Sequence, residues 1–389
     1  MIPAASPAPH PAPDPADWKR LWRDAVRDPA ELLALLGLEG RVPGLSAGAA
    51  AQFPLRVPRG FVARMRQGDP HDPLLRQILP LDEELRPMPG FGLDAVGDAA
   101  AKAATGVIHK YAGRALLIAT GSCAIHCRYC FRRHFPYAEE TAAAGQWREA
   151  VEAIRTDASI DEVILSGGDP LSLSTAKLAE LTAQLATVPH LRRLRIHTRL
   201  PVVLPERVDS ELTAWLHALP WPVAMVLHAN HAQEFDASVD LAMARLRDAR
   251  ATLLNQAVLL RGVNDSVDAL AALSERSFAA GVLPYYLHQL DRVAGSAHFE
   301  VDDERALALH SALMARVSGY LVPKLVREVA GDPGKRPLSA GTALPQTSLR
   351  TERQQTETSI VGTEAGTAYH TLPPGEPPAC RKVTIPRCV

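Results

Sequence analysis

The feature that most constrains the fold is a regular alternation of strand-like and helix-like segments from residue 114 onward. Strands that alternate with amphipathic helices at intervals of roughly 30 residues form βαβ units and a parallel sheet. A closed barrel of this kind needs eight repeats, and this sequence supplies six, so we expect a partial, open (β/α)6 barrel. The expected strands cover 114–121, 162–169, 191–199, 222–230, 251–262 and 282–291, and the expected helices 146–156, 176–187, 209–219, 236–249, 266–280 and 303–318.

The segments outside this alternation differ in composition. Residues 1–17 are a Pro-rich leader, which predicts disorder. Residues 18–110 mix helical patterns with irregular Pro- and Gly-rich stretches, and they predict an N-terminal helical extension. The barrel is expected over 111–338. Residues 339–389 show no strand or helix periodicity, so we predict a flexible tail.

Bulk composition disfavours several classes of protein. The charges of the 389 residues nearly cancel, with a net charge of −1, so nothing favours nucleic acid or a membrane surface as a partner. No apolar run approaches the ~18 residues of a membrane span. The N-terminus lacks the pattern of a secretory signal, so we expect a cytoplasmic protein. Five cysteines do not make a disulfide scaffold in so long a chain, and clustered thiols then predict metal binding or catalysis.

Three of those cysteines, Cys123, Cys127 and Cys130, form a C-x3-C-x2-C array directly after the first expected strand. Active sites of parallel α/β folds gather at the carboxyl ends of the strands. Three thiolates on one loop can bind three irons of a 4Fe–4S cluster, and the fourth iron keeps an open position. The alternative is a zinc site completed by His126 or His134, but no second pair of zinc ligands follows at the usual spacing.

The array and its position resemble those of radical S-adenosylmethionine (SAM) enzymes, in which the open iron binds SAM and reductive cleavage yields a 5′-deoxyadenosyl radical. The stretch Ser166-Gly167-Gly168-Asp169 resembles the glycine-rich stretch of that superfamily, and the resemblance implies that it contacts SAM. Alone, glycines after a strand indicate only a turn, in which Asp169 could be a turn residue. His228, Asn230 and Gln256 are expected in the barrel interior near SAM.

Further motifs narrow the resemblance. In chain order they are CRYCFRRHF, VILSGGDPL, RIHTRLPVVLPERV, QAVLLRGVND, LPYYLHQLD and GDPGKRPL. Over residues 18–338 the chain is similar to the lysine 2,3-aminomutase family, and segment 53–80 and the short ending most resemble the branch linked to elongation factor P. The resemblance implies pyridoxal 5′-phosphate (PLP) as a further cofactor. It also implies conversion of L-lysine to (R)-β-lysine, which a separate ligase attaches to elongation factor P.

The same resemblance assigns PLP-binding residues. Lys335, in the GDPGK motif, matches the PLP lysine of the family. Tyr111 and Arg114, at the start of the first expected strand, match positions that line PLP and its phosphate. An arginine suits a phosphate because its planar fork donates several hydrogen bonds. PLP would hold the migrating nitrogen and stabilise the rearranging radical.

Substrate-binding residues follow from the resemblance as well. Arg132 matches the arginine that pairs with the substrate carboxylate, a contact that suits a guanidinium fork. Its neighbour Arg133 is expected to be solvated. Asp291 matches one of two carboxylates that hold the lysine ε-ammonium. Glu328 stands where the related enzymes have the second carboxylate, an aspartate, and it is one methylene longer.

Other interpretations stay open at this point. An aminomutase for another amino acid, such as glutamate, is disfavoured by the acidic pair Asp291 and Glu328. A non-catalytic iron–sulfur or zinc protein would cleave no SAM, and a radical SAM enzyme without PLP would not need Lys335. Cys380 and Cys388 lie in a sequence unlike the zinc-binding region of classical members, so we expect no structural zinc. The oligomeric state stays open, and a homo-oligomer is one alternative.

Overall fold

One sheet of ten strands organises the protein, and each strand pairs with its neighbours in chain order. This computed structural model describes residues 17–140 and 147–339. The predictions for the leader, the tail, Cys380 and Cys388 fall almost entirely outside these residues. The strands are β1 (Lys102–Ala104), β2 (Val107–Tyr111), β3 (Arg114–Thr120), β4 (Glu162–Gly167), β5 (Arg193–Thr198), β6 (Val223–Leu227), β7 (Ala251–Val258), β8 (Leu283–His288), β9 (Lys324–Arg327) and β10 (Arg336–Pro337).

The parallel part of the sheet runs from β3 to β9. Its first six strands are the six expected from the sequence. Antiparallel strands β1 and β2 extend one edge, and β10 pairs antiparallel with β9 at the other. Within the described residues no ladder joins β1 to β10, so the sheet stays open. The predicted partial barrel is confirmed. β9 is a further parallel strand that the sequence analysis did not predict.

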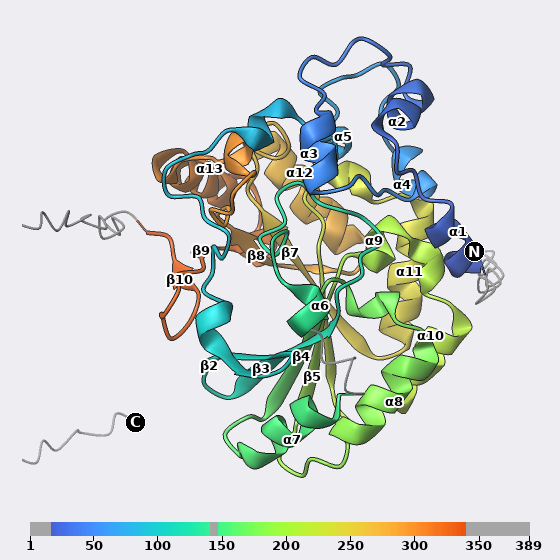
Figure 1. Ribbon diagram of the computed structural model, residues 1–389, viewed down its shortest axis with the longest axis vertical. Helices are drawn as coiled ribbons and strands as arrows, with labels where there is room; N and C mark the ends of the chain where they lie inside the picture. The colour runs from blue at the N-terminus through green and yellow to red at the C-terminus, as the bar shows by residue number, and fades with distance from the viewer. Residues whose placement is uncertain (1–16, 141–146, 340–389) are drawn as a thin grey trace, which may run out of the picture. The chain divides into compact units, whose positions relative to one another are not determined.

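Helices cover the outer face of the curved sheet (Figure 1). Five of the six long helices begin at a Ser or Asp whose side chain accepts a backbone N–H of the first turn, which satisfies donors that the helix leaves free. The capped helices are α8 (Thr175–Leu185), α10 (Ser210–Ala218), α11 (Ala237–Asp248), α12 (Val267–Ala279) and α13 (Asp303–Arg316). Together with α7 (Arg148–Thr156) they correspond to the six expected helices.

The N-terminal extension lies against the loops at the carboxyl ends of the barrel strands (Figure 1). The N–H of His126 donates to the carbonyl of Arg56 over 3.0 Å, and that of Arg128 to Gln77 over 2.9 Å. The extension therefore packs directly on the cysteine loop. Its helices are α1 (Asp17–Arg23), α2 (Pro29–Leu35), α3 (Ala47–Gln52), α4 (Arg59–Val62), α5 (Pro73–Arg76), η1 (Asp82–Leu85) and η2 (Ala99–Ala101).

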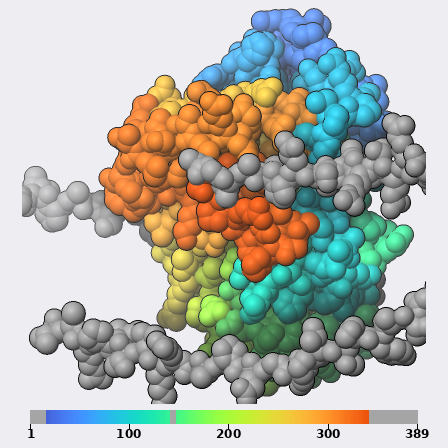
Figure 2. All heavy atoms as spheres, turned by 90° about the vertical axis from the view of Figure 1, so that its left-hand side faces the viewer, coloured from blue at the N-terminus to red at the C-terminus, as the bar shows by residue number. Residues whose placement is uncertain are grey.

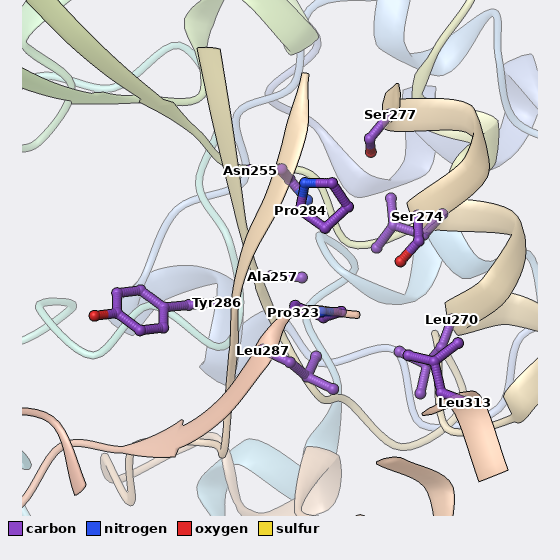
Figure 3. A pocket seen from close by; sticks show the side chains of 11 residues that line it. Asn255, Ala257, Leu270, Ser274, Ser277, Pro284, Tyr286, Leu287, Leu313 and Pro323 are labelled. Atoms are coloured by element: carbon purple, nitrogen blue, oxygen red, sulfur yellow. The ribbon is translucent and has the colours of Figure 1, made fainter. Parts of the chain in front are cut away.

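A register shift in β8 decides which side chains face the barrel interior. The pairing with β7 skips a residue between Pro284 and Tyr286. As a result Pro284 and Leu287 both pack against α12 in a small apolar gap behind the sheet, whereas Tyr286 points to the opposite face (Figure 3). Bulges of this kind re-aim side chains near active sites. None of the helices in the described part of the chain is long and apolar enough to cross a membrane.

Candidate active site

The clustered cysteines lie on the loop that follows β3. Cys123, Cys127 and Cys130 are free and half-buried. The loop turns tightly, since the N–H of Cys130 donates to the carbonyl of Cys127 over 3.0 Å. Burial, Asp169 and the other two thiols raise the pKa of Cys123, and burial together with Cys127 raises the pKa of Cys130 to about 11. A bound metal, which stabilises thiolates, would reverse both shifts.

The zinc alternative gains no support from this loop. Among residues 17–140 and 147–339, no three His, Cys, Asp or Glu side chains converge closely enough to hold one metal ion. His126 Nδ1 hydrogen bonds to the carbonyl of Pro54 at 2.7 Å, and His134 Nε2 to that of Ala294 at 3.1 Å. A four-iron cluster is a larger body whose thiolate ligands stand apart around it. The three cysteines therefore fit a cluster better than a single zinc ion.

Two buried arginines fasten the cysteine loop to the N-terminal extension. Arg128 is fully buried, and its Nε donates to Glu84 over 2.8 Å. Arg133 donates to the same carboxylate over 2.8 Å, and its side chain is only 2% exposed. The expectation that Arg133 is solvated was therefore wrong. Its partner Glu84 comes from a segment that looks irregular in sequence, 49 residues away, so no local pattern could reveal the pair.

The Gly-Gly step after β4 is explained by close packing against the cysteine loop. A Cβ on Gly167 would lie 2.5 Å from the carbonyl oxygen of Thr120, and a Cβ on Gly168 would lie 2.5 Å from that of Ser122. Gly167 also has a φ of +113°, which other residues rarely adopt. The two glycines thus let β4 end beside the cysteines, where the resemblance places SAM.

The carboxylate of Asp169 joins the ends of β4 and β5. It accepts hydrogen bonds from the Thr198 hydroxyl at 2.7 Å and from the N–H groups of Arg199 and Leu200 at 2.7 and 2.9 Å. A further bond comes from the N–H of Leu171 at 3.1 Å. The Asp169 side chain is thus committed to the turn, and any ligand contact of this stretch would come from backbone atoms or Ser166.

Five alternating charges, here called the charge chain, connect Arg132 to Lys335. Arg132 Nε lies 2.8 Å from Asp98 Oδ2, and Asp98 Oδ1 lies 2.6 Å from Lys110 Nζ. Lys110 Nζ also lies 3.0 Å from Glu328 Oε1, and Glu328 Oε2 lies 2.7 Å from Lys335 Nζ. No side chain of the five is more than 20% exposed. Figure 2 shows the red segment that follows β9 beside the cyan segment that contains β2.

The charge chain unites three predicted residues with two that the sequence did not indicate. Arg132, Glu328 and Lys335 were candidates, whereas Asp98 and Lys110 lie in or near segments without a motif. Burial disfavours the charged form of Asp98 and of Glu328, but the adjoining cations outweigh burial and lower the pKa of both carboxyls. Both acids are therefore ionised at neutral pH, and each holds a cation in place on either side.

Asp291 lies close to the charge chain but titrates differently. Burial and the nearby Glu328 raise the pKa of Asp291 to about 7, although Lys335 and Lys110 act in the opposite direction. A carboxyl in this state would gain from the arrival of another cation. The structure thus brings Asp291, Glu328 and Lys335 within electrostatic reach of one another, as the resemblance implied.

Tyr111 and Arg114 face each other across the turn between β2 and β3. The guanidinium carbon of Arg114 lies 4.7 Å from the centre of the Tyr111 ring. The Tyr111 hydroxyl is buried, and within the described residues it has no hydrogen-bond partner of normal geometry. Burial and the charge of Glu328 raise its pKa. A polar ligand bound next to Glu328 would satisfy a buried donor of this kind.

The residues expected in the barrel interior do face it. Asn230 is fully buried and donates to the Tyr129 hydroxyl over 2.6 Å. His228 stacks on the same tyrosine, with ring centres 5.9 Å apart. Gln256 is half-buried on β7. Its neighbours Asn255 and Ala257 line the gap behind the sheet, so the Gln256 side chain lies on the other face, toward the barrel interior. Tyr286, re-aimed by the bulge, adds a ring whose centre is 5.9 Å from Lys335 Nζ.

The arrangement suits a ligand with two ends of opposite charge. Arg132 donates to the Ser166 hydroxyl over 3.2 Å through Nη1, so its fork connects the end of β4 with the charge chain. Asp291, Glu328 and Lys335 lie at the other end. A carboxylate would be attracted to the first end and an ammonium group to the second.

Comparison with known proteins identifies the family. The model of the radical SAM superfamily matches residues 117–223. An L-lysine 2,3-aminomutase of Escherichia coli is 48% identical over 316 residues, which is 81% of this chain and 92% of that protein. The enzymes of that name from Haemophilus influenzae and Clostridium subterminale are 45% and 33% identical, over 80% and 74% of this chain and 93% and 69% of theirs. The chain therefore belongs to the L-lysine 2,3-aminomutase family of radical SAM enzymes.

Proposed function

We propose that this isomerase converts L-lysine to (R)-β-lysine by moving the amino group from C2 to C3, with a 4Fe–4S cluster, SAM and PLP as cofactors. The charge chain is the observation that carries the proposal. It joins the cysteine loop through Arg132, β2 through Lys110, and the segment after β9 through Glu328 and Lys335. Three parts of the chain that are distant in sequence thus contribute to one site.

The residues present fit the three cofactors. Cys123, Cys127 and Cys130 would hold the cluster, and the backbone at 166–168 would hold SAM. Lys335 would bind PLP, with Tyr111 and Arg114 beside it. When bound, the cluster and SAM would supply a carbon radical that removes a hydrogen atom from C3, and PLP would supply a π system that stabilises the rearranging radical.

Glu328 holds Lys335 in position. Glu328 Oε2 accepts a hydrogen bond from Lys335 Nζ at 2.7 Å, which fixes the direction of the lysine side chain. The other oxygen of Glu328 is held by Lys110 at 3.0 Å, which keeps the carboxylate in place. The departure from the aspartate of related enzymes therefore leaves this residue on Lys335, and Asp291 becomes the main partner for a substrate ammonium.

The two charged ends of the site select the substrate. Arg132 would bind the α-carboxylate bidentately, while Asp291 would bind the ε-ammonium of lysine. A substrate with an anionic side chain, such as glutamate, would instead meet Asp291 and Glu328 and be repelled. The distance between the ends would then set the length of the side chain that is accepted.

A role in the modification of elongation factor P is the finest part of the proposal. It is supported by the motifs in segment 53–80 and by the share of each relative's length that the alignment covers. The alignment covers 92% and 93% of the relatives from Escherichia coli and Haemophilus influenzae, but 69% of the Clostridium subterminale enzyme. The product would pass to a separate ligase that attaches it to a lysine of elongation factor P.

Anaerobic reconstitution tests the proposed activity. Full-length protein loaded with iron, sulfide and PLP is incubated with SAM, dithionite and either L-lysine or L-glutamate, and the products are separated on a chiral column. We expect (R)-β-lysine and 5′-deoxyadenosine with lysine, and no amino shift with glutamate. β-Glutamate without β-lysine would contradict the substrate assignment. SAM cleavage with undiminished turnover in Lys335→Ala would contradict the role of PLP.

A further inference from the structure

We infer that Arg199 raises the reduction potential of the iron–sulfur cluster by donating a charged hydrogen bond to Cys127, an inference that rests on the proposed role of the three cysteines. Arg199 follows β5, and only 6% of it is exposed. Its Nη1 lies 2.8 Å from Cys127 Sγ and 2.7 Å from the Tyr129 hydroxyl. The proposed binding of lysine and PLP does not use this guanidinium.

Buried groups hold the guanidinium in this position. Its Nη2 donates to Glu234 Oε2 over 2.9 Å and to Gln77 Oε1 over 2.7 Å, and both partners are fully buried. Gln77 in turn donates to Glu234 over 3.2 Å. Since Glu234 meets Nη2 and the sulfur meets Nη1, the cation stands between the carboxylate and Cys127. We call Arg199, Glu234, Gln77, Tyr129 and Asn230 the Cys127 network.

The ion pair in this network is charged at neutral pH. Burial alone would raise the pKa of Glu234, but Arg199 and several N–H donors outweigh it and lower that pKa. The backbone N–H of Asn230, at 2.8 Å from Glu234, is one of these donors. The site therefore presents a fixed positive charge to Cys127, with its compensating negative charge on the far side.

A cation in this place favours the reduced cluster. Reduction brings one electron from a low-potential one-electron donor, so it adds negative charge next to Arg199. Hydrogen bonds to the sulfurs and local charge are among the factors that set the potential of such clusters. The interaction is weakly screened because the network is buried. Arg199 Nε is also buried and has no partner among the described residues, so it offers a second donor that the protein itself does not use.

The test is a potentiometric titration, monitored by electron paramagnetic resonance, of the full-length protein reconstituted anaerobically without SAM or lysine. Arg199→Met removes the charge and keeps most of the bulk, whereas Arg199→Lys keeps the charge. We expect Arg199→Met to lower the equilibrium constant for reduction at least tenfold, which is about 59 mV for a one-electron couple. Arg199→Lys should recover most of this loss. Iron and sulfide per chain are counted for each protein.

Two further variants separate charge from folding. Arg199→Met leaves Glu234 buried without a cation, so Arg199→Met/Glu234→Gln is titrated as well and should also be harder to reduce than the parent. The matched control is Arg207→Met/Asp209→Asn. It removes another fully buried pair, for which the described residues show no bond to a cysteine, and it should leave the potential unchanged.

The outcomes distinguish this inference from the proposed function. A parent protein that takes up no 4Fe–4S cluster would overturn the role of the three cysteines. A parent with a full cluster, together with Arg199 variants that hold the same iron and show the same potential, would overturn the inference alone. Where Arg199→Met fails to hold a full cluster, the reduction potential of Arg199→Met/Glu234→Gln decides whether the inference stands.

Discussion

Around Cys127 one buried ion pair, Arg199 and Glu234, lies among neutral side chains, whereas around Lys335 the partners alternate in charge from Arg132 to Lys335. Both regions include residues of the cysteine loop and of the N-terminal extension. The first adds the segments after β5 and β6, and the second adds β2 and the segment after β9. Arg199 there has four side-chain partners, including Gln77 and Glu234. At the Lys335 end, Tyr111 keeps a buried hydroxyl without a partner of normal geometry in the described chain.

This difference teaches how one barrel mouth serves two purposes. A cofactor that carries electrons benefits from surroundings that do not move, because its potential depends on fixed dipoles and charges. A substrate that enters and leaves needs charges that can exchange one partner for another at small cost. In the Cys127 network four side chains contact Arg199, and in the charge chain cations and carboxylates alternate.

The largest expected effect comes from removing one essential residue from each of the two regions in turn. Lys335→Ala should lower turnover by about 10³-fold or more, as loss of a covalent catalytic group does, while the iron content stays at the parent level. Cys130→Ala should abolish turnover to a similar extent and lose iron, while PLP absorbance is retained. Iron counts and absorption spectra check both. Loss of both cofactors in either variant would show that the two regions are not independent.

The next effect concerns the ammonium end. Asp291→Asn keeps the size of the side chain but removes its charge, and loss of one partner of a buried charge pair costs about 2–5 kcal/mol. We expect kcat/KM for L-lysine to fall by about 10²-fold or more, since each 1.4 kcal/mol is about tenfold. Steady-state kinetics measure this. Asp268→Asn, at a side chain that is 83% exposed, is the control and should match the parent, and an undiminished rate in Asp291→Asn would remove this residue from the site.

The pH dependence offers a milder test of the same region. The pKa of Asp291 is raised to about 7 in the substrate-free protein, so the charged form is present above pH 7 and is lost as the pH falls. Because kcat/KM reports the free enzyme, it should fall about tenfold per pH unit below 7. Profiles of kcat/KM between pH 6 and 8.5 check this. A profile that is flat to pH 6 would show that a charged Asp291 is not required.

The smallest expected effect lies at the junction between the regions. Asp98→Asn keeps a hydrogen-bond acceptor for Arg132 but removes the charge, and Arg132 then loses part of its fixed orientation. A hydrogen bond to a charged group contributes about 1.5–3 kcal/mol, of which Asn retains a share, so we expect KM for lysine to rise about five- to tenfold with kcat nearly unchanged. A fall in kcat at constant KM would indicate that Asp98 acts in the chemical step instead.

Repeating patterns made much of the fold predictable. The alternation of strand-like and helix-like segments identified six strands and six helices. Helix starts coincide with Ser and Asp caps such as Ser174 and Asp236. Strands β1, β2, β9 and β10 escaped notice because they are short, with five residues or fewer, and lie outside the regular alternation with long helices by which β6, also of five residues, was identified. β9 is formed by packing against β8, which only the folded chain supplies.

The candidate site was predictable where residues form a motif. The cysteines and the Gly-Gly step carry local signals, and Lys335 sits in a recognisable stretch. Asp98, Lys110 and Glu84 do not, since each is a single charged residue whose partner lies far away in sequence. Arg199 lies in the motif RIHTRLPVVLPERV, but the motif does not indicate its partners. Arg199 and Gln77, for example, are 122 residues apart. These residues matter because their side chains are buried in the fold, and burial of single charged residues cannot be predicted from the local sequence.

The most direct test of the central claim, that one site joins a cluster, the PLP lysine and the lysine-binding charges, is to follow the migrating nitrogen. Reconstituted protein is given SAM, dithionite, unlabelled ammonium and L-lysine labelled with nitrogen-15 at the α-amino group. The account predicts β-lysine that retains the full label on C3, and none from Lys335→Ala. β-Lysine with diluted label, or 5′-deoxyadenosine formed without any β-lysine, would contradict it.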